Sequence, residues 1–461
     1  MSLNVVILAA GKGTRMRSSL PKVLQPLAGQ PLLQHVINRA KQLNAAHIFT
    51  VVGHQSHLVE DAMAGQDIDF VLQAQQLGTG HAVQQVSPFI KDDDTVLVLY
   101  GDVPLTAKST LDDLLSLVTD QHPLALLTLN LANPTGYGRI LRDQHHQVTA
   151  IVEQKDATAQ QLTVTEVNTG ILATQGKQLK QWLARLQSNN AQGEFYLTDI
   201  IAMAVADGFA VQTTQPASEM EVLGVNDKLQ LAALERQYQQ SLANSLMHRG
   251  VTLLDPSRID IRGELLVGQD VEIDANVIFE GQVQLGNHVK IGANCVLKKV
   301  VIADHTVIHP FSHLDGCQIG SEVSIGPYAR LRPGTELADK VRIGNFVETK
   351  QAKIAQGSKV NHLSYIGDTV MGEQCNIGAG TITCNYDGVN KHQTLIGDRV
   401  FVGSDTQLIA PVRVESDATI GAGSTITKTA PAGQLTLSRA KQLTLAGWQK
   451  PTRLQKNEQV K

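Results

Sequence analysis

The apolar positions in the first half of the chain follow two periods in turn. Four short runs rich in β-branched residues predict strands at residues 3–9, 48–53, 69–73 and 95–102. Between them apolar residues recur every three or four positions, as in residues 32–43, where Pro31 suits the first turn of a helix. Strands alternating with helices predict a mostly parallel, Rossmann-like α/β sheet with helices on both faces. Ligands of such sheets bind at the carboxyl ends of the strands.

A long amphipathic helix is predicted at residues 228–250, with Gly250 placed to end it. At 1.5 Å per residue it spans roughly 30 Å. We interpret it as a spacer between two domains, residues 1–228 and 250–461, with the linker helix proper at 229–249; a partner-binding helix is the alternative. Its apolar positions are Leu231, Leu234, Tyr238, Leu242 and Leu246.

Beyond residue 260 the apolar positions recur every six residues. Seven consecutive repeats keep this phase: Ile261, Val267, Ile273, Phe279, Leu285, Ile291 and Leu297. A second set lies four residues behind: Val271, Val277, Val283, Val289, Cys295 and Val301. After a change of register come Ile319, Ile325, Leu331, Leu337 and Ile343, and later Ile396, Val402, Leu408, Val414, Ile420 and Ile426. A period of six is typical of a parallel β-helix, in which each hexapeptide forms one side of a triangular coil.

The segment LAAGKGTRM, residues 8–16, is a glycine loop directly after the first predicted strand, and it carries the cations Lys12 and Arg15. Met16 occupies the place of the third glycine of a dinucleotide fingerprint, and the Walker spacing is also absent. Such a loop suits a polyphosphate, with a tight structural turn as the alternative. Lys22 adds a further cation, and Asp102, at the end of a strand, is a candidate Mg²⁺ ligand or else a turn aspartate.

Function in a repetitive coil is expected where the period breaks. The period breaks at residues 345–368 and at 379–394, the second a predicted projecting loop. His362 lies in the first and is a candidate general base; a structural histidine is the alternative. The polar residues that gather around it in sequence favour a site over a solvated face: Arg332, Lys350, Tyr365, Asn376 and Asn385.

A second histidine pattern predicts no metal site. His305, His309 and His313 are spaced by four, which would align them on a helix. On a six-residue coil the same spacing places them on different sides.

Composition narrows the class of protein. The chain has 461 residues, a formal net charge of −4 and 42% hydrophobic residues, which predicts two or three globular domains and no nucleic-acid partner. No basic leader and no apolar run of membrane-spanning length is seen, so a cytoplasmic protein is expected. The cysteines form no CxxC pair and are predicted to be buried free thiols: Cys295, Cys317, Cys375 and Cys384.

Several segments carry a resemblance that covers the whole chain in order. LAAGKGTRMRSSLPKVL resembles the signature of sugar-1-phosphate nucleotidyltransferases. QAQQLGTGHAV, LYGDVPL, GYGRI, IVEQKDAT, EVNTGI, GEFYLTDII and EVLGVND resemble one bacterial family, the bifunctional N-acetylglucosamine-1-phosphate uridyltransferases/glucosamine-1-phosphate N-acetyltransferases. SKVNHLSYIGD and GAGTITCNYDG are similar to the left-handed β-helix acetyltransferase part of that family.

For the first half, the resemblance implies uridyl transfer from UTP with Mg²⁺ bound by Asp102 and Asn226. Arg15 and Lys22 would neutralise phosphate charge. The remaining implied residues approach the nucleotide (Leu8, Ala9, Gly11), recognise uracil (Gln73, Gly78, Thr79), line the site (Tyr100, Gly101) or hold N-acetylglucosamine (Gly138, Glu153, Asn168).

For the second half, the resemblance implies acetyl transfer from acetyl-CoA to glucosamine 1-phosphate, with His362 as the base. The other implied residues bind the 1-phosphate (Arg332, Lys350), hold the sugar (Tyr365, Asn376), lie beside the acetyl group (Asn385, Tyr386) or line the coenzyme A channel (Ala379, Ser404, Ala422, Arg439). The tail that follows the repeat begins at Leu437; its head, which includes Arg439, is expected to pack on the last coils, and its polar end to be disordered.

The resemblance further implies a homotrimer that makes UDP-N-acetylglucosamine for peptidoglycan and lipopolysaccharide. His392 and Gln393 depart from the family pattern, which leaves the contacts of that loop tip open. Two other hypotheses stay open at this point. One is a single-activity nucleotidyltransferase whose coil serves only oligomerisation, and the other is a nucleotidyltransferase with a different base choice.

Overall fold

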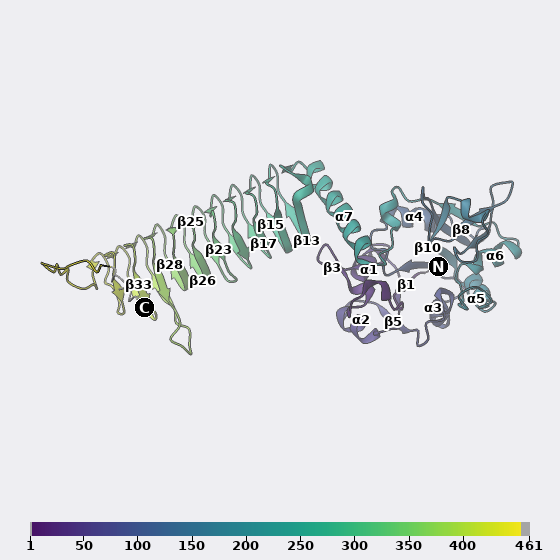
Figure 1. The fold of residues 1–461 in the computed structure, drawn as a ribbon, viewed down its shortest axis with the longest axis horizontal. Helices are drawn as coiled ribbons and strands as arrows, with labels where there is room; N and C mark the ends of the chain where they lie inside the picture. Colours follow the sequence, from purple (N-terminus) through teal and green to yellow (C-terminus); the bar gives the residue numbers. More distant parts are fainter. Residues whose placement is uncertain (1, 453–461) are drawn as a thin grey trace, which may run out of the picture. The chain divides into compact units, whose positions relative to one another are not determined.

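The computed structural model describes residues 2–452, and the chain forms two compact units (Figure 1). The first comprises Met1–Leu246 with Ile259–Gly263, and the second comprises Met247–Arg258 with Glu264–Lys461. The polar end of the tail, residues 453–461, lies outside the described residues.

The first unit is built on a mixed sheet in the order β11-β7-β10-β6-β1-β4-β5, with β8 and β9 attached beside β10. The central strands β6, β1, β4 and β5 are parallel, and β10 runs antiparallel to β6 and β7. Leu8 at the end of β1 pairs with Tyr100 at the end of β6, so the segments that follow both strands meet at one edge. The strands are β1 (Leu3–Leu8), β4 (His47–Val52), β5 (Asp69–Leu72), β6 (Thr95–Tyr100), β7 (Leu124–Asn130), β8 (Arg139–Arg142), β9 (Val148–Val152), β10 (Glu166–Gln175) and β11 (Gln212–Thr214), with a separate pair β2 (Pro26–Leu27) and β3 (Gln30–Pro31).

Helices cover both faces of this sheet, as the alternation of periods predicts. Apolar residues of α1, α2 and α4 pack on one face, and those of α3, α5 and α6 pack on the other. None of the described helices has the length and apolarity needed to cross a membrane. The helices are α1 (Leu32–Gln42), α2 (Ser56–Ala62), α3 (Thr79–Val86), α4 (Lys108–Ser116), α5 (Gly176–Leu183), α6 (Asp199–Ala206) and α7 (Lys228–His248).

Helix α7 confirms the helix predicted at residues 228–250, and as far as Leu246 it belongs to the first unit. Its Leu234 is 2% exposed and packs in a cluster with Met16, Leu27, Leu32 and Val225. This cluster lies beneath the glycine loop, because Met16 ends the short 3-10 helix η1 (Thr14–Met16) inside that loop. The helix therefore supports the loop, and its role as a spacer between the two predicted domains stays a prediction.

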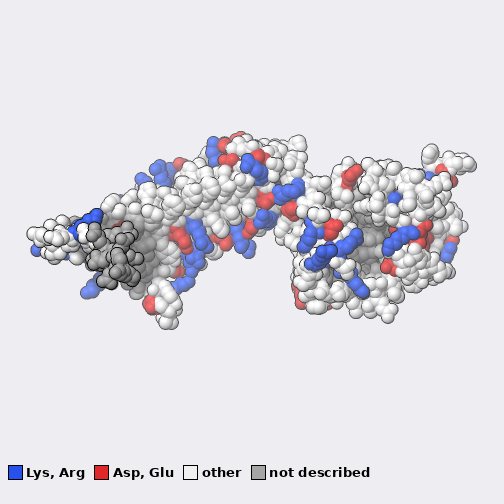
Figure 2. Space-filling view, in the orientation of Figure 1, with Lys and Arg blue, Asp and Glu red and all other residues white. Residues whose placement is uncertain are grey.

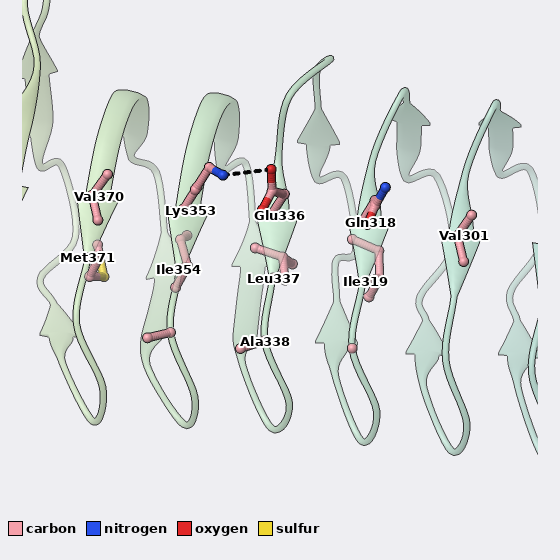
Figure 3. Close-up of a pocket in the computed structure, with 12 residues that line it drawn as sticks. Val301, Gln318, Ile319, Glu336, Leu337, Ala338, Lys353, Ile354, Val370 and Met371 are labelled. Carbon is pink, nitrogen blue, oxygen red and sulfur yellow. Dashed lines mark ion pairs between the residues drawn. The ribbon is translucent and has the colours of Figure 1, made fainter.

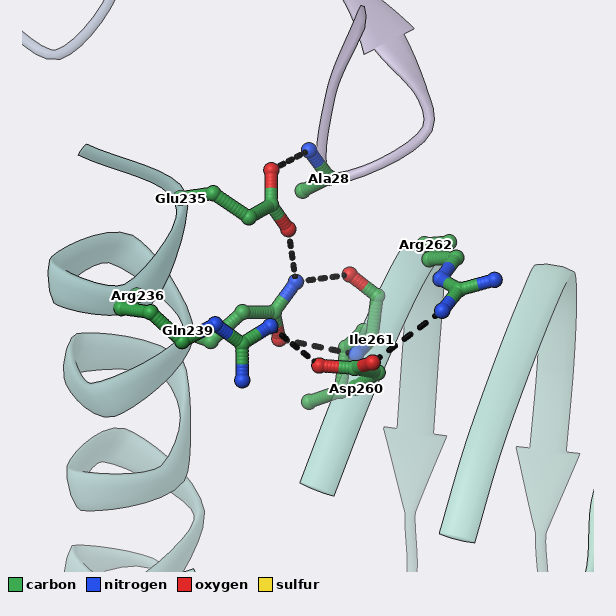
Figure 4. A network of polar contacts seen from close by, with 7 residues as sticks. All are labelled: Ala28, Glu235, Arg236, Gln239, Asp260, Ile261 and Arg262. Carbon is green, nitrogen blue, oxygen red and sulfur yellow. Dashed lines mark hydrogen bonds and ion pairs between the residues drawn. The ribbon is translucent and has the colours of Figure 1, made fainter. Parts of the chain in front are cut away.

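Polar contacts fasten α7 to two other segments of the first unit (Figure 4). The buried Gln239 side chain donates to the Ile261 carbonyl and accepts from the Ile261 N–H, both at 2.8 Å. Glu235 accepts from the Ala28 N–H at 2.7 Å. Because Gln239 satisfies both main-chain groups of Ile261, the start of β13 (Ile259–Val267) is held by the helix.

The second unit is a parallel β-helix, as the period of six predicts. Strands of successive coils pair in parallel, and the longer β26 pairs along two faces, with β23 through Glu348 and with β24 through Lys353. One face comprises β12 (Thr252–Leu253), β14 (Glu272–Ile273), β16 (Lys290–Ile291), β19 (Val307–Ile308), β22 (Ser324–Ile325), β25 (Arg342–Asn345), β27 (Lys359–His362), β29 (Asn376–Ile377), β32 (Phe401–Val402), β35 (Thr419–Ile420) and β37 (Leu435–Thr436).

The other strands of the coil form one continuous ladder around the remaining faces. Besides β13 they are β15 (Val277–Leu285), β17 (Val296–Lys298), β18 (Val301–Ile302), β20 (His313–Asp315), β21 (Gln318–Ile319), β23 (Arg330–Leu331), β24 (Glu336–Leu337), β26 (Glu348–Ile354), β28 (Tyr365–Met371), β30 (Ile382–Cys384), β31 (Thr394–Ile396), β33 (Gln407–Ile409), β34 (Val412–Val414) and β36 (Thr425–Ile426).

The predicted inward positions are buried with two exceptions. Val267 is only half-buried, because Leu265 points inward in its place. Val301 is 46% exposed, whereas Val300 and Ile302 are buried. The shift follows Lys299, whose φ of 51° places the turn of this coil before Val300. The sequence pattern predicts that the register of inward-facing residues changes after Val301. In the structure it already changes at Val300, one residue earlier.

The cysteines belong to the interior of the coil. Cys295, Cys317 and Cys375 are buried free thiols, as predicted, and Cys384 is half-buried. Burial raises the pKa of Cys295 to about 11 and that of Cys317 to about 12. These side chains therefore act as small apolar groups and not as thiolates.

Charges on the coil surface are paired between successive coils. Lys290 lies 3.2 Å from Glu272, and Arg399 lies 2.7 Å from Asp417. On the face shown in Figure 2, basic and acidic side chains are interspersed along the coils.

Candidate active sites

The glycine loop after β1 leaves its backbone open to a ligand. Gly13 has a φ of 57°, and a Cβ there would lie 2.7 Å from the Cβ of Lys22, so this turn requires glycine. A Cβ at Gly11 would instead meet no atom within 4 Å. Gly11 therefore provides the close backbone approach that a phosphate needs.

A cavity of about 610 Å³ lies where β1 and β6 end, as expected for a parallel sheet. Gly101 adjoins it and donates its N–H to the Leu8 carbonyl at 2.9 Å, which ties the two strand ends together. Ten of the predicted residues line the cavity: Leu8, Ala9, Gly11, Lys22, Gln73, Gly78, Thr79, Tyr100, Asp102 and Asn226.

Asp102 and Asn226 both face the ammonium group of Lys22. The Nζ atom of Lys22 lies 2.5 Å from Oδ2 of Asp102 and 3.3 Å from Oδ1 of Asn226. Arg15 donates to the same amide oxygen at 2.9 Å. A carboxylate oxygen and an amide oxygen are suitable ligands for a divalent metal ion. Its remaining coordination positions would be taken by water and by substrate phosphates. Within residues 2–452 no group of three or more His, Cys, Asp or Glu side chains could hold a metal ion.

The far end of the cavity is shaped by the turn before α3. Gly78 has a φ of 111°, and a Cβ there would lie 2.6 Å from the Phe195 carbonyl oxygen. Thr79 Oγ1 accepts from the Leu197 N–H at 3.1 Å. Residues 78 and 79 are thus held against residues 195–197. Position 78 has no room for a Cβ atom, so it requires glycine.

Three residues predicted to hold the sugar form a neighbouring cluster. The Asn168 N–H donates to the Gly138 carbonyl at 2.9 Å, and a Cβ on Gly138 would lie 3.4 Å from the Glu153 carboxylate. Burial raises the pKa of Glu153, against the effect of a 3.2 Å hydrogen bond from Thr198 Oγ1. A partly buried carboxylate with unused acceptor capacity suits sugar hydroxyls.

Tyr100 stands between this cluster and the cation-binding pair. Its ring lies against Gly170, where a Cβ would come within 2.5 Å of the ring. Burial raises the pKa of Tyr100, and the charges of Glu153 and Asp102 raise it further. Both carboxylates therefore lie close enough to Tyr100 to join the two groups of residues into one site.

Three further polar residues line the cavity: Lys12, which was predicted only as a cation of the glycine loop, and Gln76 and Glu194, which were not predicted. Lys12 and Glu194 lie inside segments that carry the family resemblance, so their position in those segments was an available signal. Gln76 also lies in such a segment, QAQQLGTGHAV, so the same signal was available for it.

In the second unit, His362 ends β27 and is exposed. It pairs in register with Asn345 at the end of β25, and its Nδ1 lies 3.1 Å from Oδ1 of Asn345. The two strand ends bring the imidazole to a corner of the coil, where it can meet a ligand.

Basic side chains gather at another place on these coils. Arg332 donates to Glu348 at 2.9 Å. A hydrogen bond with the neighbouring Lys391 is the largest cause of a lowered pKa at Lys350. Desolvation lowers this pKa further, and so do the positive charges of Lys391 and Arg332. Lys391, from the projecting loop, was not predicted as a site residue. Three cations held this close together suit a phosphate.

Tyr365 and Asn385 meet across two coils. Asn385 Nδ2 donates to Asp368 and lies 3.5 Å from the Tyr365 hydroxyl. A Cβ on Gly367 would lie 2.4 Å from the Tyr365 hydroxyl oxygen, so glycine is required beneath the ring. Asn376 starts β29, next in line on the face that carries His362. The structure therefore brings Tyr365 and Asn385 into contact and places Asn376 opposite Lys359, on the strand next to the one that ends in His362.

The predicted coenzyme A residues form a row along one corner of the coil. The Ala379 carbonyl accepts from the Asp405 N–H at 2.7 Å, and the Ser404 carbonyl accepts from the Gly423 N–H at 2.8 Å. Arg439 donates to the Ala422 carbonyl at 3.0 Å, so the head of the tail does pack on the last coils. Small side chains stacked in this way leave an extended strip for a long ligand.

The loop from Asn385 to His392 is hydrogen-bonded within itself. The His392 N–H donates to the Asn385 carbonyl at 2.8 Å, and its ring lies 2.7 Å from the Asp387 carboxylate. The hydrogen bond with His392 is the largest of several contacts that hold the pKa of Asp387 well below its usual range. Tyr386 is exposed on the same loop, and Gln393 is exposed where the loop rejoins the coil. His392 therefore shapes the loop that presents Lys391.

A groove of about 500 Å³ runs along another face of the coil (Figure 3). Apolar side chains of successive coils form its floor, and the Lys353–Glu336 ion pair at 3.0 Å borders it. Val301 and Val370 are exposed in it, at 46% and 39%. None of the predicted site residues lines this groove.

Comparisons with known proteins cover both units. Residues 5–164 match the MobA-like NTP transferase domain, residues 261–345 match the GMPPB C-terminal domain, and residues 393–428 match the bacterial transferase hexapeptide (six repeats). The bifunctional protein GlmU of Hydrogenovibrio crunogenus is 68% identical over 453 residues, which are 98% of this chain and 100% of that protein. The bifunctional protein GlmU of Marinobacter nauticus is 58% identical over 449 residues, 97% of this chain and 99% of that protein. A solved UDP-glucose pyrophosphorylase bound to UDP-glucose is 17% identical, with a TM-score of 0.44, and covers 52% of this chain and 100% of its own.

Proposed function

The chain belongs to the GlmU family of bifunctional proteins, and from this membership we propose which of its residues carry each reaction. It is an N-acetylglucosamine-1-phosphate uridyltransferase and a glucosamine-1-phosphate N-acetyltransferase. Acetyl transfer comes first, because its product is the acceptor of the uridyl group. The hypothesis of a single activity with a purely structural coil is thereby set aside.

The observation that carries the uridyltransferase assignment is the convergence of Asp102, Asn226 and Lys22 at the edge of the cavity. Asp102 and Asn226 would hold a divalent metal, which we propose to be Mg²⁺ and which would supply positive charge beside the phosphates of UTP. Lys22 and Arg15 add the cations that offset repulsion between two anionic substrates.

The cavity and the neighbouring cluster of Gly138, Glu153 and Asn168 together orient the reacting groups. The Gly11 backbone approaches the phosphates, and Gln73, Gly78 and Thr79 meet the uracil. Gly138, Glu153 and Asn168 hold N-acetylglucosamine 1-phosphate so that its phosphate oxygen attacks the α-phosphorus of UTP in line and pyrophosphate leaves. A protein nucleophile is not required.

In the second unit, His362 acts as the general base. Its Nε2 takes a proton from the amino group of glucosamine 1-phosphate, and the neutral nitrogen attacks the thioester carbonyl of acetyl-CoA. The nitrogen–carbon bond forms, the carbon–sulfur bond breaks, and the coenzyme A thiolate takes up the proton that the nitrogen loses as it becomes an amide. Arg332, Lys350 and Lys391 hold the sugar phosphate, while Tyr365 and Asn376 hold the sugar. Asn385 and Tyr386 lie beside the acetyl group, and Ala379, Ser404, Ala422 and Arg439 line the coenzyme A strip.

We also propose that the chain is a homotrimer of the cytoplasm. Flat faces of a coil suit threefold packing, and the exposed Val301 and Val370 are apolar surface that such packing would cover. Exposed rings stack along the corner that leads to His362, with centroids 4.9 Å apart for Phe311 and Tyr328. Free thiols and the use of UTP and acetyl-CoA fit the cytoplasm.

One experiment tests the bifunctional assignment directly. The purified chain is incubated with glucosamine 1-phosphate, acetyl-CoA, UTP and Mg²⁺, and the products are followed by mass spectrometry. We expect N-acetylglucosamine 1-phosphate to appear first and UDP-N-acetylglucosamine to follow. Replacing Mg²⁺ with Mn²⁺, Ca²⁺ or Zn²⁺ tests the choice of metal. Light scattering tests the oligomer, and a mass of one chain at micromolar concentration would contradict the trimer.

A further inference from the structure

The side-chain amide of Gln73 is held in one orientation by two acceptors. Gln73 is 3% exposed, and its Nε2 donates to the Gly78 carbonyl at 3.1 Å and lies 3.0 Å from Nδ1 of His81. A carbonyl oxygen only accepts, so the amide atom that faces Gly78 is the nitrogen. Both N–H groups of Gln73 are therefore used inside the protein. Its Oε1 is the polar atom left for a ligand in the cavity that Gln73 lines.

His81 supplies the second of these acceptors from the first turn of α3. A neutral imidazole has one acceptor nitrogen, and two amide nitrogens face this ring: Nε2 of Gln73 lies 3.0 Å from Nδ1, and Nε2 of Gln85 lies 3.2 Å from Nε2. Gln85 has the His81 carbonyl as its own acceptor at 3.0 Å, so the lone pair is assigned to Nδ1, the closer of the two contacts, and the ring proton to Nε2. The ring of Phe195 lies beside the imidazole at a centroid distance of 6.3 Å. His81 is outside the set of described residues that line the cavity, so it acts on a ligand only through Gln73.

From this geometry we propose that His81 is a positioning residue that determines the base preference of uridyl transfer, an inference that rests on the function proposed above. Oε1 of Gln73 accepts a hydrogen bond from a ring N–H, and N3 of uracil carries one. N3 of cytosine carries a lone pair, so two acceptors would face each other and one hydrogen bond would be lost. Without His81, only Gly78 holds the amide, and rotation by half a turn presents Nε2 to the base. The rotated amide suits cytosine.

The test compares His81→Leu with His81→Asn in steady-state uridyl transfer to N-acetylglucosamine 1-phosphate. Asparagine can place its Oδ1 where Nδ1 stood, whereas leucine fills the space without an acceptor. We expect His81→Leu to raise KM for UTP roughly tenfold, to leave kcat within about threefold, and to reduce the preference for UTP over CTP roughly tenfold, the size of one hydrogen bond of this kind. We expect His81→Asn to restore both quantities to within about threefold of the parent chain.

Acetyl transfer by the same samples reports whether they are equally concentrated, and the fluorescence of Trp182, buried in the first unit, reports whether that unit is folded. Equal behaviour of the two variants, whether both are normal or both impaired, would overturn the role of His81. A parent chain that transfers no uridyl group from UTP would instead contradict the proposed function, so the two failures are distinguishable.

Discussion

The Nδ1 atom of His362 lies 3.1 Å from Oδ1 of Asn345, its partner on the neighbouring strand of the coil. Because an amide oxygen accepts, this contact places the ring proton on Nδ1 and leaves the lone pair on Nε2. The imidazole is thus prepared to accept a proton at the nitrogen that points away from Asn345. Two predictions concern this pair.

His362→Ala should remove acetyl transfer and spare uridyl transfer. Loss of a general base usually lowers the rate by about 100-fold or more. Thiol release from acetyl-CoA measures the first activity, and pyrophosphate release with supplied N-acetylglucosamine 1-phosphate measures the second. Thiol release within about tenfold of the parent chain would rule out His362 as the base.

Asn345→Leu should lower kcat for acetyl transfer roughly tenfold, because the imidazole loses the partner that fixes its tautomer and orientation. KM for glucosamine 1-phosphate should stay within about twofold, since Asn345 is assigned no substrate contact. Asn345→Asp is the matched control, because it keeps an oxygen acceptor at the same place. If both variants lose kcat equally, Asn345 serves the fold and not the histidine.

Asp102→Ala should abolish uridyl transfer and leave acetyl transfer unchanged. The change removes the carboxylate 2.5 Å from Lys22 Nζ and leaves Asn226 as the remaining proposed metal ligand. Pyrophosphate release is measured across a Mg²⁺ titration. An unchanged rate at every Mg²⁺ concentration would place the metal elsewhere, while partial rescue at high Mg²⁺ would support weakened binding at this pair.

Glu153 should lower the stability of the first unit at neutral pH. Burial is the largest cause of its raised pKa in the folded chain, so its neutral form is favoured there. Its contribution to stability is therefore present below the ordinary value of 4.5 and is lost as the pH rises through the raised pKa. Glu153→Gln removes this dependence.

The measurement is thermal unfolding followed by the fluorescence of Trp182, which is fully buried in the first unit. We expect Glu153→Gln to unfold at a higher temperature than the parent chain at neutral pH and to show no gain below pH 4.5. KM for N-acetylglucosamine 1-phosphate should rise at the same time, because the proposed sugar ligand is altered. A gain of equal size at both pH values would contradict the titration of Glu153.

Cutting the chain near residue 228 tests how far the first domain extends. The piece 1–227 holds every residue assigned to uridyl transfer, so we expect it to keep the activity. It lacks Leu234, which packs with Met16 beneath the glycine loop, and Glu235, which accepts from Ala28. We therefore expect it to unfold at a lower temperature than the piece 1–263. Equal stability would show that α7 only spaces the two domains, and an inactive but folded 1–263 piece would show that its site needs later residues.

The repetitive parts of the fold could be predicted from local pattern alone. Each hexapeptide places one apolar side chain inward, so the period of six indicates the coil without knowledge of any contact. The same holds for the parallel strands, whose carboxyl ends carry the glycine loop and Asp102. Prediction went wrong at Val301, because the turn of one coil falls a residue earlier and changes which side chain faces inward.

The pairs of side chains that fix the chemistry were decided only by the tertiary structure. Asn345 meets His362 because two strands pair in register, and Lys391 meets Lys350 because a loop closes on itself through His392 and Asp387. His81 reaches Gln73 because a turn and a helix bring two neighbouring segments back together. Sequence motifs name the groups that touch a substrate, since the chemistry demands their type. The groups that orient them depend on distance and angle, which arise only when the coils and strands are packed.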